Sequence, residues 1–362
     1  MKTKILFSSN SLKRGGKERQ LTLLFSSLNS DKFEKHILCK NLTPNNYLEE
    51  YSVNQNQISV TWKLRGFYRI LKSFNPDIVW GWDMISVFYL LILSPFFSYK
   101  IVNGSIRHGI RGKKLTHYLR SFIAWISPWV VANSEAGLYV NNMKKSKKRL
   151  VLYNGIETHI EKLDKEEKKQ KLIEYFKDYN SEDELVFISI ANLVPYKDYN
   201  TVLSAMYELK DIVKFRYFIL GDGPLRKKTE DIIATFGLRE RVYLAGRVNN
   251  VNKYLELSDI MIHSSRGEGV SNAILEGMFA GLPIIAARVG GIPETVYSKG
   301  SLLFPYADKN VLKKHLLSAK SFLNEFDPKE KEYLHHLQKF TKESMLENFE
   351  KVIKQIVDNE SL

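Results

Sequence analysis

Two glutamates stand eight positions apart in a stretch rich in glycine and small polar residues, SSRGEGVSNAILEGMFAGLP (264–283). On one continuous helix, Glu268 and Glu276 would point roughly 80° apart. Glycines on both sides of Glu268 oppose a helix, however, and Ser271 or Asn272 is a good N-cap. The helix is therefore predicted to begin after Glu268 and to contain Glu276. A phosphate or other anion at that helix N-terminus would have one acid at each flank.

Other loops with glycines or a cation follow apolar runs. In ANLVPYKD (191–198), Lys197 follows a strand-like run and precedes a helix, which suits a point charge against a phosphate. GDGP (221–224) and LAGRVNN (244–250) are glycine turns that end further apolar runs. In GGKER (15–19), a glycine pair allows a backbone to approach a ligand closely beside a helix start. It is not the dinucleotide-binding pattern G-x-G-x-x-G, and a plain tight turn explains it as well.

Strand-like and helical runs alternate along the chain in two sets. The predicted strands are 4–8, 36–39, 77–80, 101–105, 129–132 and 150–153, then 185–190, 215–220, 241–245, 259–262 and 283–287. Continuous apolar strands between helices predict parallel sheets covered on both faces. We therefore expect an α/β chain with two doubly wound, Rossmann-like domains. Ligands of such sheets bind beyond the carboxyl ends of the strands, so we expect the site in a central cleft between the two sheets.

The expected division is residues 1–160, residues 161–335 and a C-terminal helix within 336–362. A chain of 362 residues is long enough for two ordinary cores. A charged connector over 157–184 leads into the second domain. The pattern of 331–357 is helical throughout, and the C-terminal helix is expected to pack back on the first domain.

The charge is concentrated in the first half. Residues 1–155 carry 24 Lys and Arg against 8 Asp and Glu, whereas residues 156–362 carry 30 against 32. The basic half predicts an anionic partner: nucleic acid, an anionic membrane surface or an anionic lipid-linked substrate. A solvated surface without a partner explains clusters such as RGKK (111–114) and KKSKKR (144–149) equally well.

Composition excludes several other classes of protein. Cys39 is the only cysteine, which excludes a disulfide framework and favours a reducing compartment. The N-terminal apolar run is too short for a secretory signal. The most apolar stretch, 84–97, contains a proline and falls short of the roughly 20 residues that span a bilayer. We expect a cytoplasmic protein that can still contact a membrane surface.

Taken in order, these motifs resemble those of the retaining glycosyltransferases of family 4, which have the GT-B fold and include bacterial polysaccharide enzymes. Glu268-Gly269 and Glu276 fit the family's E-x7-E signature. The similarity extends over nearly the whole chain. The further matching segments are GGKER, ANSEA (132–136), YNGIE (153–157), ANLVPYKD, GDGP, Gly281-x-Pro283 and Gly290-Gly291-x-x-Glu294.

The resemblance implies that a nucleoside diphosphate sugar binds mainly to the second domain and the acceptor mainly to the first. Glu276 would then hold the ribose hydroxyls, Lys197 the pyrophosphate and Glu268 the sugar hydroxyls. The backbone at the helix start would bind the distal phosphate, and that near Arg247 and Val248 the base. The implied donor-binding residues are Gly16, Asn192, Lys197, Gly221, Arg247, Val248, Glu268, Gly269, Val270, Ser271, Asn272 and Glu276.

One position departs from the family pattern, and at another the pattern leaves a choice between two residues. The family often has an arginine where this chain has Asn192, so that positive charge is either missing or supplied elsewhere, by Arg266 or Arg226. In GSIRHG (104–109), either His108 or Arg107 is implied as a ligand of the donor sugar. The implied catalytic residues are Glu268, Lys197, His108 and Arg107. No metal or other cofactor is expected, because a lysine and a helix N-terminus can replace the cation.

The sequence thus predicts a retaining transferase that moves a hexose or N-acetylhexosamine from a nucleotide sugar, first of all a UDP-sugar. The acceptor would be a lipid-linked saccharide in surface polysaccharide synthesis, at the inner face of the cytoplasmic membrane. The basic first domain would contact the anionic membrane. One alternative is a non-catalytic or nucleic-acid-binding protein of the same fold, although no nucleic-acid-binding module is recognisable. Another is a nucleotide-sugar epimerase.

Overall fold

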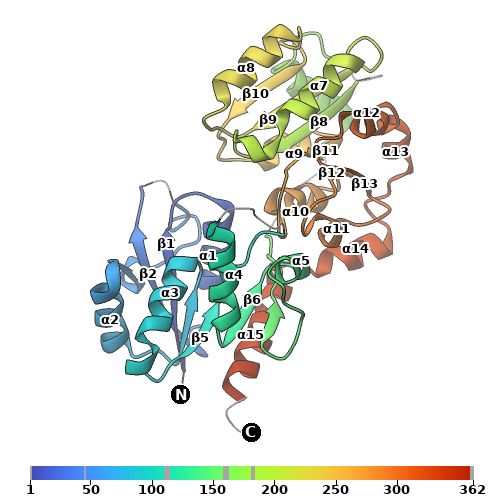
Figure 1. The fold of residues 1–362 in the computed structure, drawn as a ribbon. Coiled ribbons are helices and arrows are strands. Elements are labelled where there is room, and N and C mark those ends of the chain that lie inside the picture. Colours follow the sequence, from blue (N-terminus) through green and yellow to red (C-terminus); the bar gives the residue numbers. More distant parts are fainter. Residues whose placement is uncertain (1, 45, 110–114, 158–162, 181–183, 359–362) are drawn as a thin grey trace. The chain divides into compact units, whose positions relative to one another are not determined.

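The computed structural model describes residues 2–44, 46–109, 115–157, 163–180 and 184–358, which form two compact units. Unit 1 comprises Met1–Gly155 and Phe340–Leu362, and unit 2 comprises Ile156–Lys339. Each unit has one parallel sheet between layers of helices (Figure 1). The predicted α/β fold with two Rossmann-like parallel-sheet domains is confirmed. The cluster at 111–114 and parts of the connector, 158–162 and 181–183, lie outside the described residues.

The seven strands of unit 1 are parallel, in the order β3-β2-β1-β4-β5-β6-β7. The chain moves outward in opposite directions from β1 and β4, so the carboxyl ends of these two strands mark the topological switch point. The strands are β1 (Thr3–Ser11), β2 (Phe33–Asn41), β3 (Ile58–Val60), β4 (Ile78–Gly81), β5 (Lys100–Asn103), β6 (Trp129–Ala132) and β7 (Arg149–Val151). The helices are α1 (Gly16–Ser27), η1 (Gln55–Gln57), α2 (Lys63–Phe74), α3 (Met84–Leu93), η2 (Ser94–Phe96), α4 (Leu115–Ile126), α5 (Glu135–Val140) and α15 (Lys342–Asp358).

Different helices cover the two faces of this sheet. Helices α1 and α15 share one apolar core with β1 and β4, whereas α2, α3 and α4 pack on the opposite face. The ring of Phe349 on α15 stacks on Trp80 of β4 with centroids 5.1 Å apart. The last helix of the chain therefore completes the core of unit 1.

The run 331–357 is helical as its pattern predicts, except for a break between α14 and α15 that the pattern did not show. The ring of Phe340 in the break is fully buried and lies 5.4 Å from the ring of Tyr153. Thr341 then starts α15, where its Oγ1 accepts a hydrogen bond from Ser344 N over 3.1 Å. The boundary between the two units falls at this break.

The six strands of unit 2 are parallel, in the order β10-β9-β8-β11-β12-β13, with the switch point between β8 and β11. The strands are β8 (Leu185–Ile190), β9 (Phe215–Leu220), β10 (Val242–Gly246), β11 (Ile260–His263), β12 (Ile284–Ala287) and β13 (Ser301–Phe304). The helices are α6 (Lys165–Ile173), η3 (Pro195–Lys197), α7 (Tyr199–Leu209), α8 (Arg226–Thr235), α9 (Asn252–Glu256), α10 (Asn272–Phe279), α11 (Ile292–Thr295), α12 (Lys309–Leu317), α13 (Ala319–Glu325) and α14 (Lys331–Gln338).

Two strands, β3 and β13, have no counterpart among the predicted strands. Both lie at the edge of their sheet, where one side of the strand lacks a neighbouring strand. β3 has three residues, none of them buried, and only the last residue of β13 is buried. Edge strands of this kind lack the continuous apolar run by which the inner strands are recognised.

Candidate functional site

The charged side chains of interest in unit 2 gather at the switch point of its sheet. β8 and β11 are parallel neighbours there, so the loops that follow them start side by side. Arg266 N donates to Tyr196 O over 2.6 Å, and Ser264 Oγ donates to Lys197 O over 2.7 Å. These bonds tie the loop after β11 to η3 and bring Lys197 to Glu268.

Lys197, Glu268 and His263 form a compact cluster at this point. Nζ of Lys197 donates to Oε1 of Glu268, and Nε2 of His263 lies 3.2 Å from the same oxygen. His263 is only 3% exposed, and the other two side chains are mostly buried. Gly291 N donates to Glu268 O over 3.0 Å, so the backbone of the glutamate is fixed as well.

The pKa shifts in this cluster have clear causes. Burial raises the pKa of Glu268, but the charge of Lys197 and the hydrogen bond from His263 outweigh it and hold the pKa below its ordinary value. Burial lowers the pKa of His263. Its imidazole is therefore neutral near pH 7, with the ring proton assigned to Nε2 because that nitrogen faces a carboxylate. Glu268 is thus held ionised by one cation and one neutral donor.

The segment after Glu268 begins a helix where the glycine and cap pattern predicts it. α10 starts at Asn272, with Ser271 at the N-cap position in an extended conformation (φ −83°, ψ 119°). The Ser271 side chain makes no capping hydrogen bond. Glu276 lies in the second turn and is 6% exposed. Glu268 therefore precedes the helix and Glu276 lies inside it, as the sequence predicts.

Gly269 and Val270 complete the short loop between Glu268 and α10, and both are buried. The next helix starts only four residues after the glutamate. The first N–H groups of an α-helix have no partner within the helix, and they carry the positive end of its dipole. The start of α10 is therefore an anion-binding arrangement next to the Lys197 ammonium.

Close backbone contacts bind together the loops that follow β8, β9 and β10. Gly221 has φ +144°, and a Cβ at this position would lie 2.0 Å from the carbonyl oxygen of Ala191. Gly221 N also donates to Gly246 O over 2.7 Å, and Gly246 itself has φ +71°. Only glycine fits Gly221 without moving the backbone of the neighbouring loop.

The other predicted donor residues of unit 2 lie on these same loops. Asn192 and Arg247 expose their side chains, and Val248 is half-buried. All three follow the carboxyl ends of β8 and β10, the two strands on either side of β9. They therefore lie along the edge of the sheet where ligands of doubly wound folds bind.

The two candidates for the missing family arginine differ in their surroundings. Arg226 is already paired, because its Nε donates to Glu230 over 2.9 Å and its Nη1 lies 3.9 Å from Asp222. Arg266 is exposed and lies two positions before Glu268, in the loop that is bonded to η3. Arg266 is therefore the better placed of the two.

In unit 1, the predicted residues lie near the switch point between β1 and β4. Gly15 is the N-cap of α1 and Gly16 its first residue. A Cβ on Gly15 would lie 2.6 Å from the Oε2 of Glu18, which is buried in the first turn. The glycine pair thus makes room for a carboxylate against the start of the helix.

Arg107 and His108 are placed differently. The Arg107 guanidinium lies 3.8 Å from the ring centroid of Trp82, and its Nε donates to Gly104 O over 3.2 Å. Burial lowers the pKa of Arg107, while the charge of Glu18 raises it. The His108 side chain is exposed. Arg107 is therefore packed within unit 1, whereas His108 extends into solvent.

The sequence prediction missed His263. The available signal was a polar residue at the end of the apolar run DIMIH (259–263), which becomes β11. The distance from His263 to Glu268 depends on how the loop folds back, and no sequence pattern specified that. Among the residues that the structure describes, no group of three or more His, Cys, Asp or Glu side chains is placed to hold a metal ion.

Comparison with known proteins places the cluster in a recognised domain. Residues 171–321 match the family described as "Glycosyl transferases group 1". This range contains Lys197, His263, Glu268 and Glu276. The four residues thus lie within the part of the chain that matches this family.

Two relatives each align with about a third of the chain. The chain is 32% identical over 129 residues to "N-acetyl-alpha-D-glucosaminyl L-malate synthase" of Bacillus anthracis, covering 35% of this chain and 34% of the relative. It is 30% identical over 109 residues to "Lipopolysaccharide core biosynthesis glycosyltransferase LpsD" of Rhizobium meliloti (strain 1021), covering 30% of this chain and 31% of the relative. Each alignment spans about a third of the relative's length.

A solved structure resembles nearly the whole chain. Anabaena Alr3699/HepE in complex with UDP and glucose has a TM-score of 0.81 and 17% sequence identity, covering 97% of this chain and 99% of that one. Identity this low shows the fold alone. The chain therefore has the GT-B fold of two Rossmann-like domains and carries a glycosyl transferases group 1 domain, and its named relatives support a transferase.

Proposed function

We propose that this chain is a retaining glycosyltransferase of family 4 that uses a nucleoside diphosphate sugar, first of all a UDP-sugar. A hexose or N-acetylhexosamine would pass to a lipid-linked saccharide in the synthesis of a surface polysaccharide. The matched domain supports sugar transfer. The relative named for lipopolysaccharide core biosynthesis supports the pathway class, and the structural neighbour in complex with UDP and glucose supports the donor class.

The observation that carries this proposal is the position of Lys197 and Glu268 beside the start of α10. Both lie at the switch point of the sheet, where doubly wound folds bind their ligands. A diphosphate needs compensation for its negative charge, and a lysine together with a helix N-terminus supplies it without a metal ion. The proposal therefore includes no cofactor.

The individual roles follow from this placement. Lys197 binds the pyrophosphate, and the backbone from Gly269 to Asn272 binds the distal phosphate at the start of α10. Glu276 accepts hydrogen bonds from the ribose hydroxyls, because one carboxylate can accept from both. Arg266 adds the charge that Asn192 does not provide.

Glu268 is proposed to bind the hydroxyls of the donor sugar. In the structure its carboxylate is paired with Lys197. A bound pyrophosphate competes with that carboxylate for the Lys197 ammonium, so donor binding weakens the pair. His263 still donates to Glu268 when the lysine turns to the phosphate, and we assign it the role of a positioning residue.

Four further groups complete the donor site in the proposal. The tight turns at Gly221 and Gly246 leave space for the nucleotide, and the backbone near Arg247 and Val248 meets the base. In unit 1, the backbone at Gly16 approaches the phosphates. Either His108 or Arg107 contacts the transferred sugar. In the transfer, the bond from the anomeric carbon to the phosphate oxygen breaks, a bond to the acceptor hydroxyl oxygen forms, and the hydroxyl proton passes to the released phosphate.

The proposed location is the inner face of the cytoplasmic membrane, with the protein bound peripherally. A lipid-linked acceptor is presented at that face, and the 24 Lys and Arg of residues 1–155 complement an anionic surface. No nucleic acid is included among the partners.

A thermal-shift screen tests the donor assignment. The wild type is heated with UDP, UDP-glucose, UDP-N-acetylglucosamine and a GDP-sugar, each with and without EDTA. We expect at least one uridine nucleotide to raise the melting temperature equally in both conditions, because binding to the native state stabilises it. The shift should disappear in Lys197→Ala and persist in Lys210→Ala, a lysine of the same unit. Absence of a shift with every nucleotide would contradict the donor site, and a shift lost in EDTA would contradict metal independence.

A further inference from the structure

An unusual share of the exposed apolar surface lies on one side of unit 1. Of the 24 large apolar side chains exposed among the described residues, 12 belong to α2, α3, η2 and α4. These helices lie beside one another on one face of the sheet, with α3 between α2 and α4 (Figure 1). We call the solvent side of α3, η2 and α4 the α3–α4 face. Contiguous apolar surface of this kind marks an interaction site on a soluble protein.

The exposed residues of α4 form a continuous stripe. They recur at the three- and four-residue spacing that places side chains on one side of a helix. The stripe consists of Leu115, Tyr118, Leu119, Phe122, Trp125 and Ile126. The residues of α4 that pack inward are others, His117, Ile123 and Ala124. Helix α4 therefore has a second apolar side that no described part of unit 1 covers.

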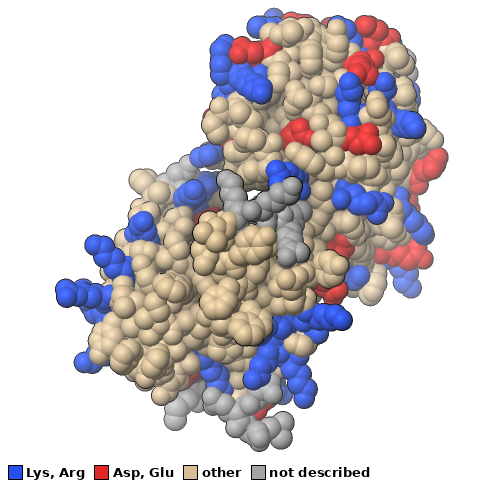
Figure 2. Space-filling model, viewed as in Figure 1, with Lys and Arg blue, Asp and Glu red and all other residues tan. Residues whose placement is uncertain are grey.

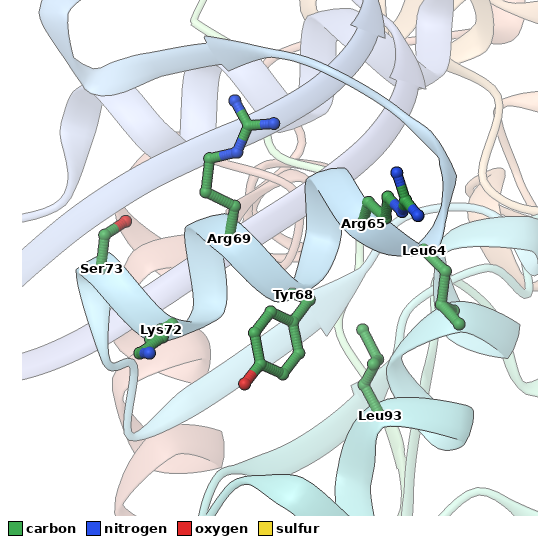
Figure 3. Close-up of a pocket in the computed structure, with 7 residues that line it drawn as sticks. All are labelled: Leu64, Arg65, Tyr68, Arg69, Lys72, Ser73 and Leu93. Carbon is green, nitrogen blue, oxygen red and sulfur yellow. The ribbon is translucent and has the colours of Figure 1, made fainter.

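Helices α3 and α2 extend this surface. On α3, Ile85, Phe88 and Ile92 are exposed at the same spacing, and Phe96 of η2 follows with 70% exposure. Next to them lies a groove of about 810 Å³ between α2 and α3. Leu64 and Tyr68 project from the side of α2 that faces Leu93 of α3, whereas Arg69 projects from the other side (Figure 3). The groove thus combines an apolar floor with cationic margins.

The charges around this surface have one sign. The sequences of α2, α3 and α4 contain no Asp or Glu, and Arg65, Arg69 and Lys72 of α2 line the groove. At the end of α4, Arg149 Nη2 donates to Trp125 O over 3.2 Å, which anchors the basic segment 144–149 beside the stripe. Figure 2 shows uncharged surface over α3 and α4, with Lys and Arg at its margins.

The two nearby carboxylates are already engaged. Asp83 caps α3, because its Oδ1 accepts from the backbone N–H groups of Ile85 and Ser86, each over 3.1 Å. Glu135 is paired with Lys145 over 3.5 Å. Glu135 thus offsets one charge of the basic segment 144–149, and the other four Lys and Arg of that segment keep the margin positive.

We propose that the α3–α4 face binds an anionic lipid bilayer, with α3 and α4 parallel to the membrane plane. Aromatic and aliphatic side chains would enter the headgroup region, and the arginines and lysines at the margin would contact lipid phosphates. A second copy of the chain is a poorer occupant, because a symmetric dimer through this face would bring the two positive margins together. No described helix is long and apolar enough to cross a membrane.

This inference deepens the proposed function, on which it rests for the choice of a membrane as partner. It does not involve the donor site of unit 2. Vesicle binding and the nucleotide-induced thermal shift are separate measurements, so failure of one proposal is distinguishable from failure of the other.

The first experiment measures the wild type on vesicles. Sedimentation with vesicles of phosphatidylglycerol and phosphatidylcholine is compared with pure phosphatidylcholine, at low salt and at roughly 0.5 M salt, where charges are strongly screened. We expect binding to the anionic vesicles at low salt and release at high salt. Absence of binding to anionic vesicles at low salt overturns the proposal, as does equal, salt-independent binding to both vesicle types.

Trp125 supplies a direct readout of depth. It is 71% exposed, whereas Trp62 is half-buried and Trp80, Trp82 and Trp129 are buried. Vesicles with bromine on the upper acyl chain should quench the fluorescence of the wild type, and the quenching should fall sharply in Trp125→Phe. Equal quenching in both proteins would place the contact elsewhere and overturn the assignment of this face.

Matched variants locate the surface. Phe122→Glu with Trp125→Glu should weaken binding to anionic vesicles about tenfold or more, because two apolar contacts are lost and two negative charges are added. The control is Ile212→Glu in unit 2, which is 70% exposed in the wild type and should have no effect. Both proteins are first checked for an unchanged melting temperature. Vesicle binding that survives the double variant would leave the membrane location standing but contradict this face.

A charge series tests the margin. Replacing Arg65, Arg69 and Lys72 together by Gln should weaken binding and reduce its salt dependence, whereas Lys227→Gln with Lys228→Gln in unit 2 should not. Analytical ultracentrifugation of the same proteins tests the remaining possibility, that a second copy of the chain occupies this face. A wild-type dimer that Phe122→Glu with Trp125→Glu dissociates, without any vesicle binding, would identify the face as a self-association surface and overturn the proposal.

Discussion

The Nε2 atom of His263 lies 3.2 Å from Oε1 of Glu268, the same oxygen that accepts a hydrogen bond from Lys197. One donor is a cation that a bound pyrophosphate would attract, and the other is a buried, neutral ring. The two hydrogen-bond donors therefore respond differently when the nucleotide sugar binds. Lys197 can turn to the phosphate while His263 keeps the Glu268 carboxylate in place.

We expect His263→Ala to lower kcat roughly 10- to 100-fold with little change in KM for the nucleotide sugar, because a hydrogen bond to a charged group is lost. His263→Gln should recover much of the activity, since an amide N–H can donate to the same carboxylate. Steady-state kinetics with the donor found in the thermal-shift screen provide the measurement. Equal activity of the wild type and both variants would remove the positioning role.

The stability of the protein should decline as the pH falls below about 6.5, the ordinary pKa of histidine. Burial lowers the pKa of His263 in the folded state, so the unfolded chain takes up a proton first as the pH decreases. The contribution of His263 to the free energy of unfolding is fully present above pH 6.5. It is lost as the pH falls toward the pKa of His263 in the folded state, by at most about 1.4 kcal/mol per pH unit for one histidine. Melting temperatures between pH 5 and 8 should fall less steeply in His263→Gln. Some decline should remain, because burial also lowers the pKa of His36 and His336; identical curves would contradict the prediction.

Glu276→Ala should weaken the binding of UDP, because it removes the carboxylate assigned to the ribose hydroxyls. A loss of about 10-fold or more is expected for two hydrogen bonds to a charged acceptor. Isothermal titration calorimetry with UDP and with uracil separates the ribose contribution from that of the base. Glu240→Gln, an exposed glutamate of the same unit, is the control and should bind UDP normally. Unchanged affinity in Glu276→Ala would contradict the ribose role.

Arg107 and His108 can be separated by comparing stability with activity. Arg107→Ala removes a guanidinium that lies on Trp82 and bonds to Gly104 O, so it should lower the melting temperature. His108→Ala changes an exposed side chain and should leave the melting temperature unchanged. A fall in kcat for His108→Ala alone would assign the donor-sugar contact to the histidine. A fall for Arg107→Lys, with a normal melting temperature, would assign it to the arginine.

Phe349→Ala should destabilise unit 1 by about 3–5 kcal/mol, because it removes a fully buried ring that stacks on Trp80. Calorimetry should show an earlier transition for unit 1, while the UDP-induced shift that reports on unit 2 is retained. Val357→Ala on the same helix is the control, since Val357 is 43% exposed and its loss should cost little. A wild-type melting curve for Phe349→Ala would show that the helix is dispensable for the core.

Much of the fold follows from local patterns in the sequence. The apolar runs LVFISI and FRYFIL coincide with β8 and β9, and the glycine and cap pattern correctly starts α10 after Glu268. These features depend on residues that are neighbours along the chain. The break before α15 was missed because it is fixed by the burial of Phe340 against Tyr153, a contact between distant segments.

The candidate site was predictable only in part for the same reason. Lys197 and Glu268 could be named because each follows a strand and stands in a motif. That they form an ion pair depends on β8 and β11 being neighbours, which follows from the strand order and not from either motif. The role of His263 depends on a loop that folds back on the end of its own strand. The exposed stripe on α4 could not be predicted either, because a sequence does not show which of two apolar sides of a helix is covered.

The return of α15 to unit 1 has a consequence for biosynthesis. Chains are made from the N-terminus, and domains generally fold as units while they emerge. Unit 2 is continuous in sequence and is complete once its last residue has left the ribosome, whereas the core of unit 1 still lacks Phe349 and Ile353 at that point. Synthesis therefore finishes the second unit before the first. A nascent chain that stops short of α15 would leave the apolar surface of unit 1 open to chaperones and proteases.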